Sequence, residues 1–216
     1  MNFKTINSDS VHTKTVIILH GMNQDVNDML YIINKIKSKK NGKFIKFIIP
    51  IAEKMNIIWP DGKKEKCSSW YNYFTRYDNL IKHDIINSIE FQKNTEEIID
   101  LINQESKIVH PEFISLIGLS QGGTICINVA LNLKYKIENI ICIDTIFLHT
   151  YYKYTPFKLQ CFKVLISNKD EIYNPMFQKY CYSLLKSYKN EVDIFTRDNY
   201  HCENSDSIAK FIMKFI

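Results

Sequence analysis

Residues 113–123 (FISLIGLSQGG) join an apolar run to a glycine-rich turn around Ser120. The run at 113–117 predicts a buried β-strand, because it is short, apolar and preceded by Pro111. Residues 118–123 match G-x-S-x-G, in which the serine occupies a sharp turn between a strand and a helix. Glycines are needed on both sides, since a Cβ there would clash with nearby backbone. The chain has six glycines and three lie in this hexapeptide, which makes the signal specific.

Apolar runs alternate with helical patterns along the rest of the chain. Strands are predicted at residues 15–19, 44–49, 113–117, 137–143, 162–166 and 192–195, the second stopped by Pro50, with residues 51–79 irregular. Helices are predicted at residues 25–39, 87–104, 121–133, 175–189 and 205–215, the last with Ser205 as N-cap. Apolar strands separated by helices predict an α/β fold with a mostly parallel sheet and helices on both faces.

Composition indicates one globular domain, residues 1–216, with 45% hydrophobic and 24% charged residues. The net charge of +5 has no accompanying nucleic-acid motif, so we expect no nucleic-acid partner. No run reaches the roughly 18–20 apolar residues of a membrane span, and no signal peptide is recognised. We therefore expect a cytoplasmic protein (the host cytoplasm if the source is viral) without stable membrane insertion. The six cysteines lack C-x-x-C spacing and are expected to be free thiols. The oligomeric state is not indicated.

A serine hydroxyl needs a base to act as a nucleophile at neutral pH. His201 lies between the last predicted strand and the last predicted helix, and reactive groups of such sheets gather at the carboxyl ends of the strands. His201 is therefore the predicted base for Ser120. His20 also follows a strand, but it precedes Ser120, whereas the base normally follows the acid near the C-terminus. The remaining histidines are predicted to be surface or structural residues: His12, His83, His110 and His149.

The third member of such a site orients the imidazole and stabilises its charged form. Asp170 and Glu171 follow the strand predicted at 162–166. Asp170 has the better spacing from the strand end, and Glu171 is the alternative. Asp144, after the strand predicted at 137–143, is a further rival. The resulting order is Ser120, Asp170, His201, each just after a strand.

A tetrahedral intermediate also needs donors for its oxyanion. One predicted donor is the backbone N–H of Gln121, directly after the nucleophile. The other is the backbone N–H of Met22, in the loop after the first predicted strand, where Gly21 permits close approach. The side chains of Met22 and Gln121 are not required for this role.

Together these segments resemble the phospholipase/carboxylesterase family of α/β-hydrolases, which includes the acyl-protein thioesterases. Residues 19–21 (LHG) look like the oxyanion segment of that family, and residues 118–123 (GLSQGG) look like its GFSQGG elbow. Residues 68–71 (SSWY) resemble its S-W-F/Y segment, while 169–172 and 200–201 fall where its acid and base lie. The resemblance implies an α/β-hydrolase fold without a large cap domain.

The implied reaction is acyl transfer to water through an acyl-enzyme on Ser120, with a Ser-His-Asp triad and no metal or organic cofactor. The implied substrates are carboxylic esters or thioesters, either small molecules or acylated proteins. A lysophospholipase or small-ester esterase is the alternative enzyme. A catalytically silent hydrolase-fold binding protein is the alternative from another class.

Aromatic residues crowd the segment before the second predicted helix: Trp59, Trp70, Tyr71, Tyr73, Phe74 and Tyr77. One hypothesis is that Trp70 and some neighbours line an acyl-binding groove. The alternative is that they are ordinary core or loop-covering aromatics.

Overall fold

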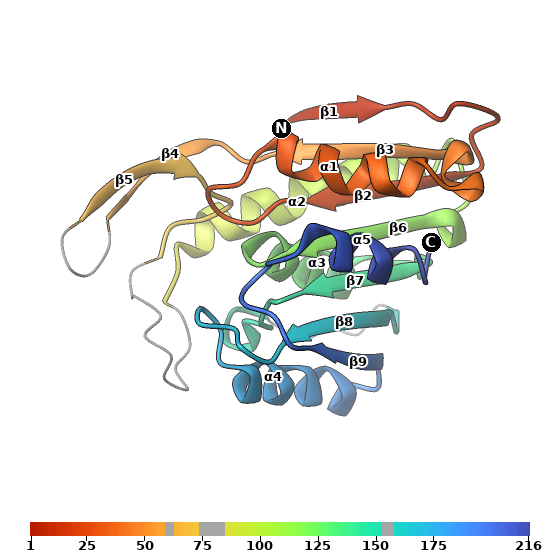
Figure 1. Cartoon of the computed structure of the whole chain (residues 1–216). Helices are drawn as coiled ribbons and strands as arrows, with labels where there is room; N and C mark the ends of the chain where they lie inside the picture. The colour runs from red at the N-terminus through yellow and green to blue at the C-terminus, as the bar shows by residue number, and fades with distance from the viewer. Residues whose placement is uncertain (59–62, 74–84, 153–157) are drawn as a thin grey trace.

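A seven-stranded sheet forms the centre of the computed structural model, which describes residues 1–58, 63–73, 85–152 and 158–216 (Figure 1). Within these residues the strand order is β1-β3-β2-β6-β7-β8-β9. All neighbours pair in parallel except β1, which is antiparallel to β3. The strands are β1 (Asn2–Ile6), β2 (Lys14–Leu19), β3 (Ile45–Ile51), β6 (Ile114–Leu119), β7 (Asn139–Ile143), β8 (Cys161–Ser167) and β9 (Glu191–Arg197). The predicted α/β fold class is confirmed.

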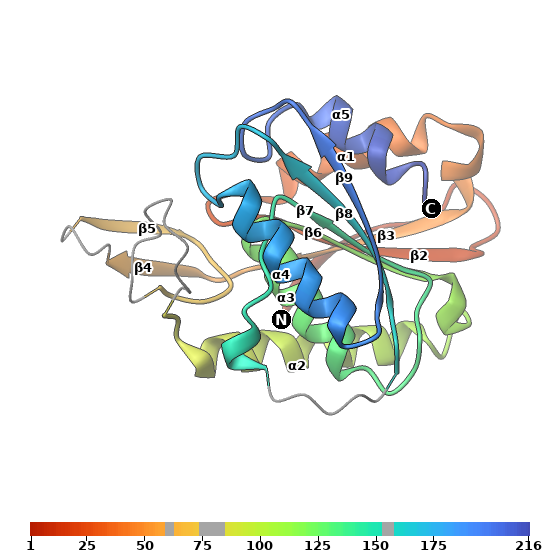
Figure 2. The ribbon, with the colours of Figure 1, turned by 90° about the horizontal axis from the view of Figure 1, so that it is seen from below.

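Alternating apolar side chains divide the core between the two faces of the sheet. In β2, Ile17 and Leu19 join one cluster, whereas Val16 and Ile18 join the other. Because successive strand residues point to opposite faces, an uninterrupted apolar run is buried on both sides. Helices α1 (Val26–Lys37) and α5 (Ser205–Ile212) cover one face, and α2 (Ser88–Glu105), α3 (Gln121–Asn132) and α4 (Pro175–Ser187) cover the other (Figures 1 and 2).

The first strand and the length of β3 differ from the sequence-based expectation. No strand was predicted at residues 2–6, and Pro50 was expected to stop the second strand. The structure instead pairs Phe3 with Pro50. The pairing of β3 with β2 ends at Ile48, so among the described strands only β1 pairs with β3 around Pro50. A proline is tolerated where one side of a strand has no partner, because its missing N–H interrupts no ladder there.

A second, two-stranded sheet lies in the segment expected to be irregular. Strands β4 (Lys54–Ile58) and β5 (Lys64–Ser68) form an antiparallel hairpin that extends beyond the carboxyl edge of the main sheet (Figures 1 and 2). Met55 pairs with Cys67 on one side of this hairpin, and Asn56 pairs with Lys66 on the other. The period-two alternation is short and mostly polar, which explains why it was not recognised.

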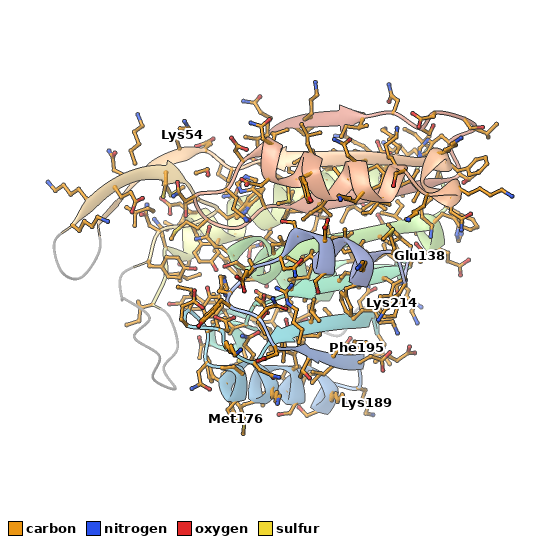
Figure 3. The ribbon with its side chains drawn as sticks, in the orientation of Figure 1. Lys54, Glu138, Met176, Lys189, Phe195 and Lys214 are labelled. Atoms are coloured by element: carbon orange, nitrogen blue, oxygen red, sulfur yellow. The ribbon has the colours of Figure 1, made fainter. Side chains whose placement is uncertain are left out.

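The side of the main sheet at which the parallel strands begin (its amino edge) and the side at which they end (its carboxyl edge) carry different chemistry. At the amino edge, lysines pair with carboxylates: Lys14 Nζ lies 2.6 Å from Glu138 Oε1, and Lys46 Nζ lies 2.6 Å from Glu105 Oε1. Figure 3 shows Glu138 at this edge and Lys54, at the start of the hairpin, at the opposite one. The polar residues predicted to act in chemistry therefore lie away from these ion pairs. No helix in the described parts of the chain is long and apolar enough to span a bilayer.

Side-chain caps fix where the helices begin. Asp25 and Asp28 form a capping box at α1. The N-cap of α5 is Asn204 rather than Ser205, and its Oδ1 accepts a hydrogen bond from Ser207 N at 3.1 Å. Asn204 has φ 61°, in the left-handed region that asparagine tolerates better than most residues. This conformation brings its side-chain oxygen to the first turn, so Ser205 becomes the first helical residue.

We expect Asn87→Ala to lower the free energy of unfolding by about 1 kcal/mol in urea denaturation. Asn87 Oδ1 accepts hydrogen bonds from the backbone N–H groups of Ile89 and Glu90, at 3.1 and 3.2 Å, at the start of α2. Asn87→Asp is the matched control, because it keeps an acceptor at the same position and should stay near wild type. Equal stability of the alanine variant and wild type would contradict this role.

Candidate active site

Ser120 lies on a strained turn between β6 and α3. Its backbone has φ 49° and ψ −121°, a conformation that non-glycine residues rarely adopt. The turn is possible because its neighbours lack side chains. A Cβ on Gly122 would lie 2.4 Å from the carbonyl oxygen of His20, and one on Gly118 would lie 2.5 Å from the Cα of Gly123. The geometry is that expected for G-x-S-x-G, and it projects the serine at the carboxyl edge of the sheet.

The three residues predicted to act together are in hydrogen-bond contact. His201 Nε2 lies 2.8 Å from Ser120 Oγ, and His201 Nδ1 lies 2.8 Å from Asp170 Oδ2. Each follows a different strand: β6 for Ser120, β8 for Asp170 and β9 for His201. The Asp170 side chain is fully buried and that of His201 is 13% exposed. The arrangement supplies a hydroxyl, a proton acceptor and a carboxylate in one line.

The choice between Asp170 and Glu171 follows from their directions. Asp170 meets the imidazole of His201, whereas Glu171 Oε2 accepts a hydrogen bond from the backbone N–H of His201 at 3.1 Å. Adjacent side chains in a turn point apart, so the two carboxylates hold the ring and the backbone of one residue. Asp170 is itself fixed by three uncharged donors: Ile172 N, Tyr173 N and Gln178 Nε2, all within 2.9 Å.

The environment of His201 favours its protonated form. Burial alone lowers the pKa of the imidazole, but Cys202 and the hydrogen-bonded Asp170 carboxylate raise it, and the net pKa lies well above the ordinary value of 6.5. Tyr173 packs edge-on against the ring, with centroids 5.6 Å apart. The imidazole is therefore oriented from two sides and able to accept the Ser120 proton.

The rival residues have other partners. The Asp144 carboxylate forms an ion pair with Arg197 at 2.9 Å rather than contacting the imidazole. His20 is buried, and burial lowers its pKa; its Nδ1 lies 2.7 Å from the Gly21 carbonyl oxygen, and its Nε2 accepts from Ala52 N. His20 is therefore a neutral structural residue. The other described histidines are His12, 2.9 Å from Thr15 Oγ1, the exposed His110, and His149, which packs on aromatic rings. His83 lies outside the described residues.

The two predicted oxyanion donors come from loops that meet beside the nucleophile. Gln121 is the first residue of α3, and the loop that carries Met22 approaches so closely that a Cβ on Gly21 would lie 3.2 Å from the Cβ of Ser120. Neither the Met22 N–H nor the Gln121 N–H donates a hydrogen bond to another described residue. Both amides are therefore available to a negatively charged oxygen.

Sequence reasoning missed what anchors these two loops. Gln121 Oε1 accepts a hydrogen bond from Trp70 N at 2.8 Å, and its Nε2 donates to Tyr71 O at 2.9 Å. The indole N–H of Trp70 donates to His20 O at 2.8 Å. Residues 69–71 thus tie the start of α3 to the loop after β2. The Gln121 side chain is not needed as an oxyanion donor, but it fixes the residue whose backbone was predicted to be one. The available signal was the SSWY segment itself.

The position of Trp70 corrects the groove interpretation for this residue. Its side chain has no exposed surface and packs with its ring centroid 5.2 Å from that of His20. A side chain held this way belongs to the core, which was the alternative. Tyr71 and Tyr73 are buried too. The other aromatics named with them, Trp59, Phe74 and Tyr77, lie outside the described residues.

Fold and site together define an α/β-hydrolase with a serine elbow at the carboxyl edge of its sheet. Comparison with known families agrees, because the family model described as Phospholipase/Carboxylesterase matches residues 1–216. The chain belongs to the phospholipase/carboxylesterase family.

Among curated relatives, the chain is 31% identical over 144 residues to acyl-protein thioesterase 1 homolog 2 of Dictyostelium discoideum, covering 66% of this chain and 62% of that protein. It is 28% identical over 142 residues to acyl-protein thioesterase 1 of Schizosaccharomyces pombe, covering 65% and 59%. The matched region therefore spans less than two thirds of either relative.

Solved structures share the fold at low sequence identity. Arabidopsis thaliana SOBER1 superposes with a TM-score of 0.78 at 14% identity, over 94% of this chain and 97% of that one. Zea mays acyl-protein thioesterase 2 gives 0.75 at 12% identity, over 99% and 98%. A Bacillus cereus carboxylesterase gives 0.75 at 11% identity, over 100% and 95%. These similarities support the α/β-hydrolase architecture.

Trp70→Phe should lower the hydrolysis rate by a similar factor for acyl chains of every length. The substitution keeps an aromatic ring but leaves His20 O without its indole donor, at a cost of about 1–3 kcal/mol. The measurement is kcat on a series of p-nitrophenyl esters from acetate to dodecanoate, with a urea melt alongside. A loss confined to long chains would instead restore the groove interpretation. Unchanged stability and rates would show that the indole hydrogen bond is dispensable.

Proposed function

We propose that this protein hydrolyses carboxylic esters or thioesters through an acyl-enzyme formed on Ser120. The observation that carries the proposal is the unbroken hydrogen-bonded line from Ser120 through His201 to Asp170, with 2.8 Å at each contact. Membership of the phospholipase/carboxylesterase family supports the same reaction class. A catalytically silent binding protein would have no need of a strained serine aligned on an imidazole. The hypothesis of an enzyme is therefore better supported.

In the proposed first step, Ser120 Oγ attacks the carbonyl carbon while His201 Nε2 takes the hydroxyl proton. The carbonyl π-bond opens, and the backbone N–H groups of Met22 and Gln121 stabilise the resulting oxyanion. Asp170 holds the imidazolium through Nδ1–H. Collapse of the intermediate breaks the bond to the leaving alkoxide or thiolate, which receives the proton from His201.

In the second step, a water molecule takes the place of the leaving group. His201 accepts one proton from the water as its oxygen attacks the acyl carbon of the Ser120 ester. Collapse of the second tetrahedral intermediate releases the carboxylic acid and returns the proton to Ser120. The balanced result is ester or thioester plus water giving acid plus alcohol or thiol.

For the substrate we propose an acylated protein or a small-molecule ester or thioester. The curated relatives named above are acyl-protein thioesterases, and one of the structural neighbours is a carboxylesterase. A lysophospholipase or small-ester esterase would use the same residues and differ in the leaving group. Parallel assays on S-acyl peptides, lysophospholipid and short-chain esters separate these substrates.

Ser120→Ala is expected to abolish labelling by a fluorophosphonate probe and to lower ester hydrolysis by at least about a thousandfold. The probe phosphonylates an activated serine, and the variant lacks the attacking oxygen. Ser183→Ala is the matched control, since Ser183 is an exposed helical serine whose hydroxyl bonds to Tyr180 O. Equal labelling of wild type and Ser120→Ala would remove the proposed nucleophile.

The rate should rise with pH through the pKa of His201, because the reaction requires the neutral imidazole. That pKa is raised, so the midpoint of the ascending limb of kcat/KM should lie above 6.5. Asp170→Asn removes the carboxylate charge, which should move the midpoint to lower pH and reduce kcat by a factor on the order of 10⁴. Glu171→Gln is the control for a neighbouring charge and should keep most of kcat. A midpoint unaffected by Asp170→Asn would count against this acid.

A further inference from the structure

A second buried carboxylate lies at the same edge as the candidate active site. Asp144 directly follows β7, has φ 46° and is fully buried. Its Oδ1 accepts from Ser167 N at 2.7 Å, and its Oδ2 accepts from Ser167 Oγ at 2.9 Å. Because Ser167 is the last residue of β8, the Asp144 carboxylate joins the ends of two neighbouring strands.

Arg197, the last residue of β9, completes the cluster from the third strand. Its Nη2 lies 2.9 Å from Asp144 Oδ2, and its Nε donates to Ser167 Oγ at 2.9 Å. The Arg197 side chain is 7% exposed and that of Asp144 is 0% exposed. Burying such a pair is costly, and apolar residues of similar volume often serve stability as well or better. The pair therefore calls for an explanation besides stability.

The cluster reaches the candidate base through the backbone. Cys202 N, directly after His201, donates to Asp144 Oδ2 at 2.9 Å. Cys202 has φ 47°, so the loop is held at this residue in a left-handed conformation that cysteine rarely adopts. The imidazole must stay within hydrogen-bond reach of Ser120 and Asp170 at once, which leaves little freedom for this backbone.

We propose that the Asp144–Arg197 pair positions His201, with Asp144 anchoring the loop at Cys202 N and Arg197 cancelling the charge of Asp144 beside the imidazole. This inference rests on the proposed function, because it assigns the pair a part in the same reaction. Neither residue contacts the reacting atoms, so both act as positioning residues. Among the described residues, Asp170 is then the one buried carboxylate in contact with the ring whose charge no cationic side chain offsets.

The groups around His201 support this assignment of roles to Asp170 and to the Asp144–Arg197 pair. Asp170, Glu171 and Tyr173 contact His201 from the loop after β8, and Cys202 is its neighbour in the chain. Asp144, which follows β7, lies one contact further away at Cys202 N, and Arg197 of β9 lies behind Asp144. Burial raises the pKa of the Cys202 thiol, and the nearby imidazole of His201 offsets part of this rise. Glu171 binds the backbone N–H of His201 rather than the ring. The imidazole therefore feels the full negative charge of Asp170, whereas the opposite charges of Asp144 and Arg197 nearly cancel at the ring.

The two charges should act on the pH profile with opposite signs. Arg197→Met leaves Asp144 as an uncompensated anion, which stabilises the imidazolium and moves the ascending limb of kcat/KM to higher pH. Asp144→Asn leaves the guanidinium uncompensated and moves the limb to lower pH. Each shift should be on the order of half a pH unit or more, and the double variant should return to the wild-type midpoint. A loop displaced by about 1 Å should also cost roughly 10- to 100-fold in kcat.

The experiment measures pH profiles of kcat/KM on a p-nitrophenyl ester, with thermal melts and fluorophosphonate labelling on the same preparations. The matched control is Lys169→Met/Asp198→Asn. It removes an exposed ion pair with a 2.9 Å contact between the loops after β8 and β9, and should leave midpoint and kcat unchanged. Loss of wild-type activity in the Ser120→Ala variant first establishes the proposed function. Opposite shifts in the two single variants, restored in the double variant, support the positioning role.

Shifts of the same sign, or midpoints equal to wild type in folded and active variants, would overturn the inference while leaving the proposed function intact. Should the charge-removing variants not fold, Arg197→Lys and Ser167→Ala decide the question, because both keep the two charges. A lowered kcat at an unchanged midpoint then supports the inference, and wild-type kcat in both overturns it. A wild-type protein that neither labels nor hydrolyses esters would instead end the proposed function.

Discussion

The imidazole of His201 is held between two partners on different strands, and this double contact is what the rest of the fold makes possible. Ser120 and Asp170 each lie 2.8 Å from one ring nitrogen, so neither can move far without breaking its hydrogen bond to the imidazole. Strands β6, β8 and β9 run parallel, which places their carboxyl ends at one edge of the sheet. Residues separated by 81 positions in the chain thereby meet within hydrogen-bond distance.

Backbone strain is concentrated at that same edge. Ser120, Asp144 and Cys202 all have positive φ, and each directly follows a strand or the candidate base. Such conformations persist where the surroundings determine them. Ser120 N donates to Ile143 O at 2.9 Å, and Asp144 N donates to Leu165 O at 2.9 Å, so the sheet ladder continues into the strained residues. The rigid sheet thus supports turns that would be unfavourable in isolation.

The features predicted from sequence were those with strong local signals. Apolar runs identified six of the seven strands of the main sheet, and the order of Ser120, Asp170 and His201 followed from where those strands end. Edge strand β1 was missed because most of its side chains are exposed and show no apolar pattern. The burial of Trp70 depends on partners far along the chain, which no local pattern contains. Between Asp170 and Glu171, spacing favoured the residue that contacts the imidazole.

The two buried aspartates at this edge show how hydrogen-bond donors decide the role of a carboxylate. Asp170 receives neutral donors from backbone and Gln178, so its negative charge remains directed at the imidazole. Asp144 receives a guanidinium at 2.9 Å, which offsets its charge and leaves it a structural acceptor. An uncompensated Asp144 would add a second anion near His201 and stabilise the imidazolium that must release its proton in each cycle. The position of Arg197 at the end of β9 therefore separates an anchoring carboxylate from one that can tune the base.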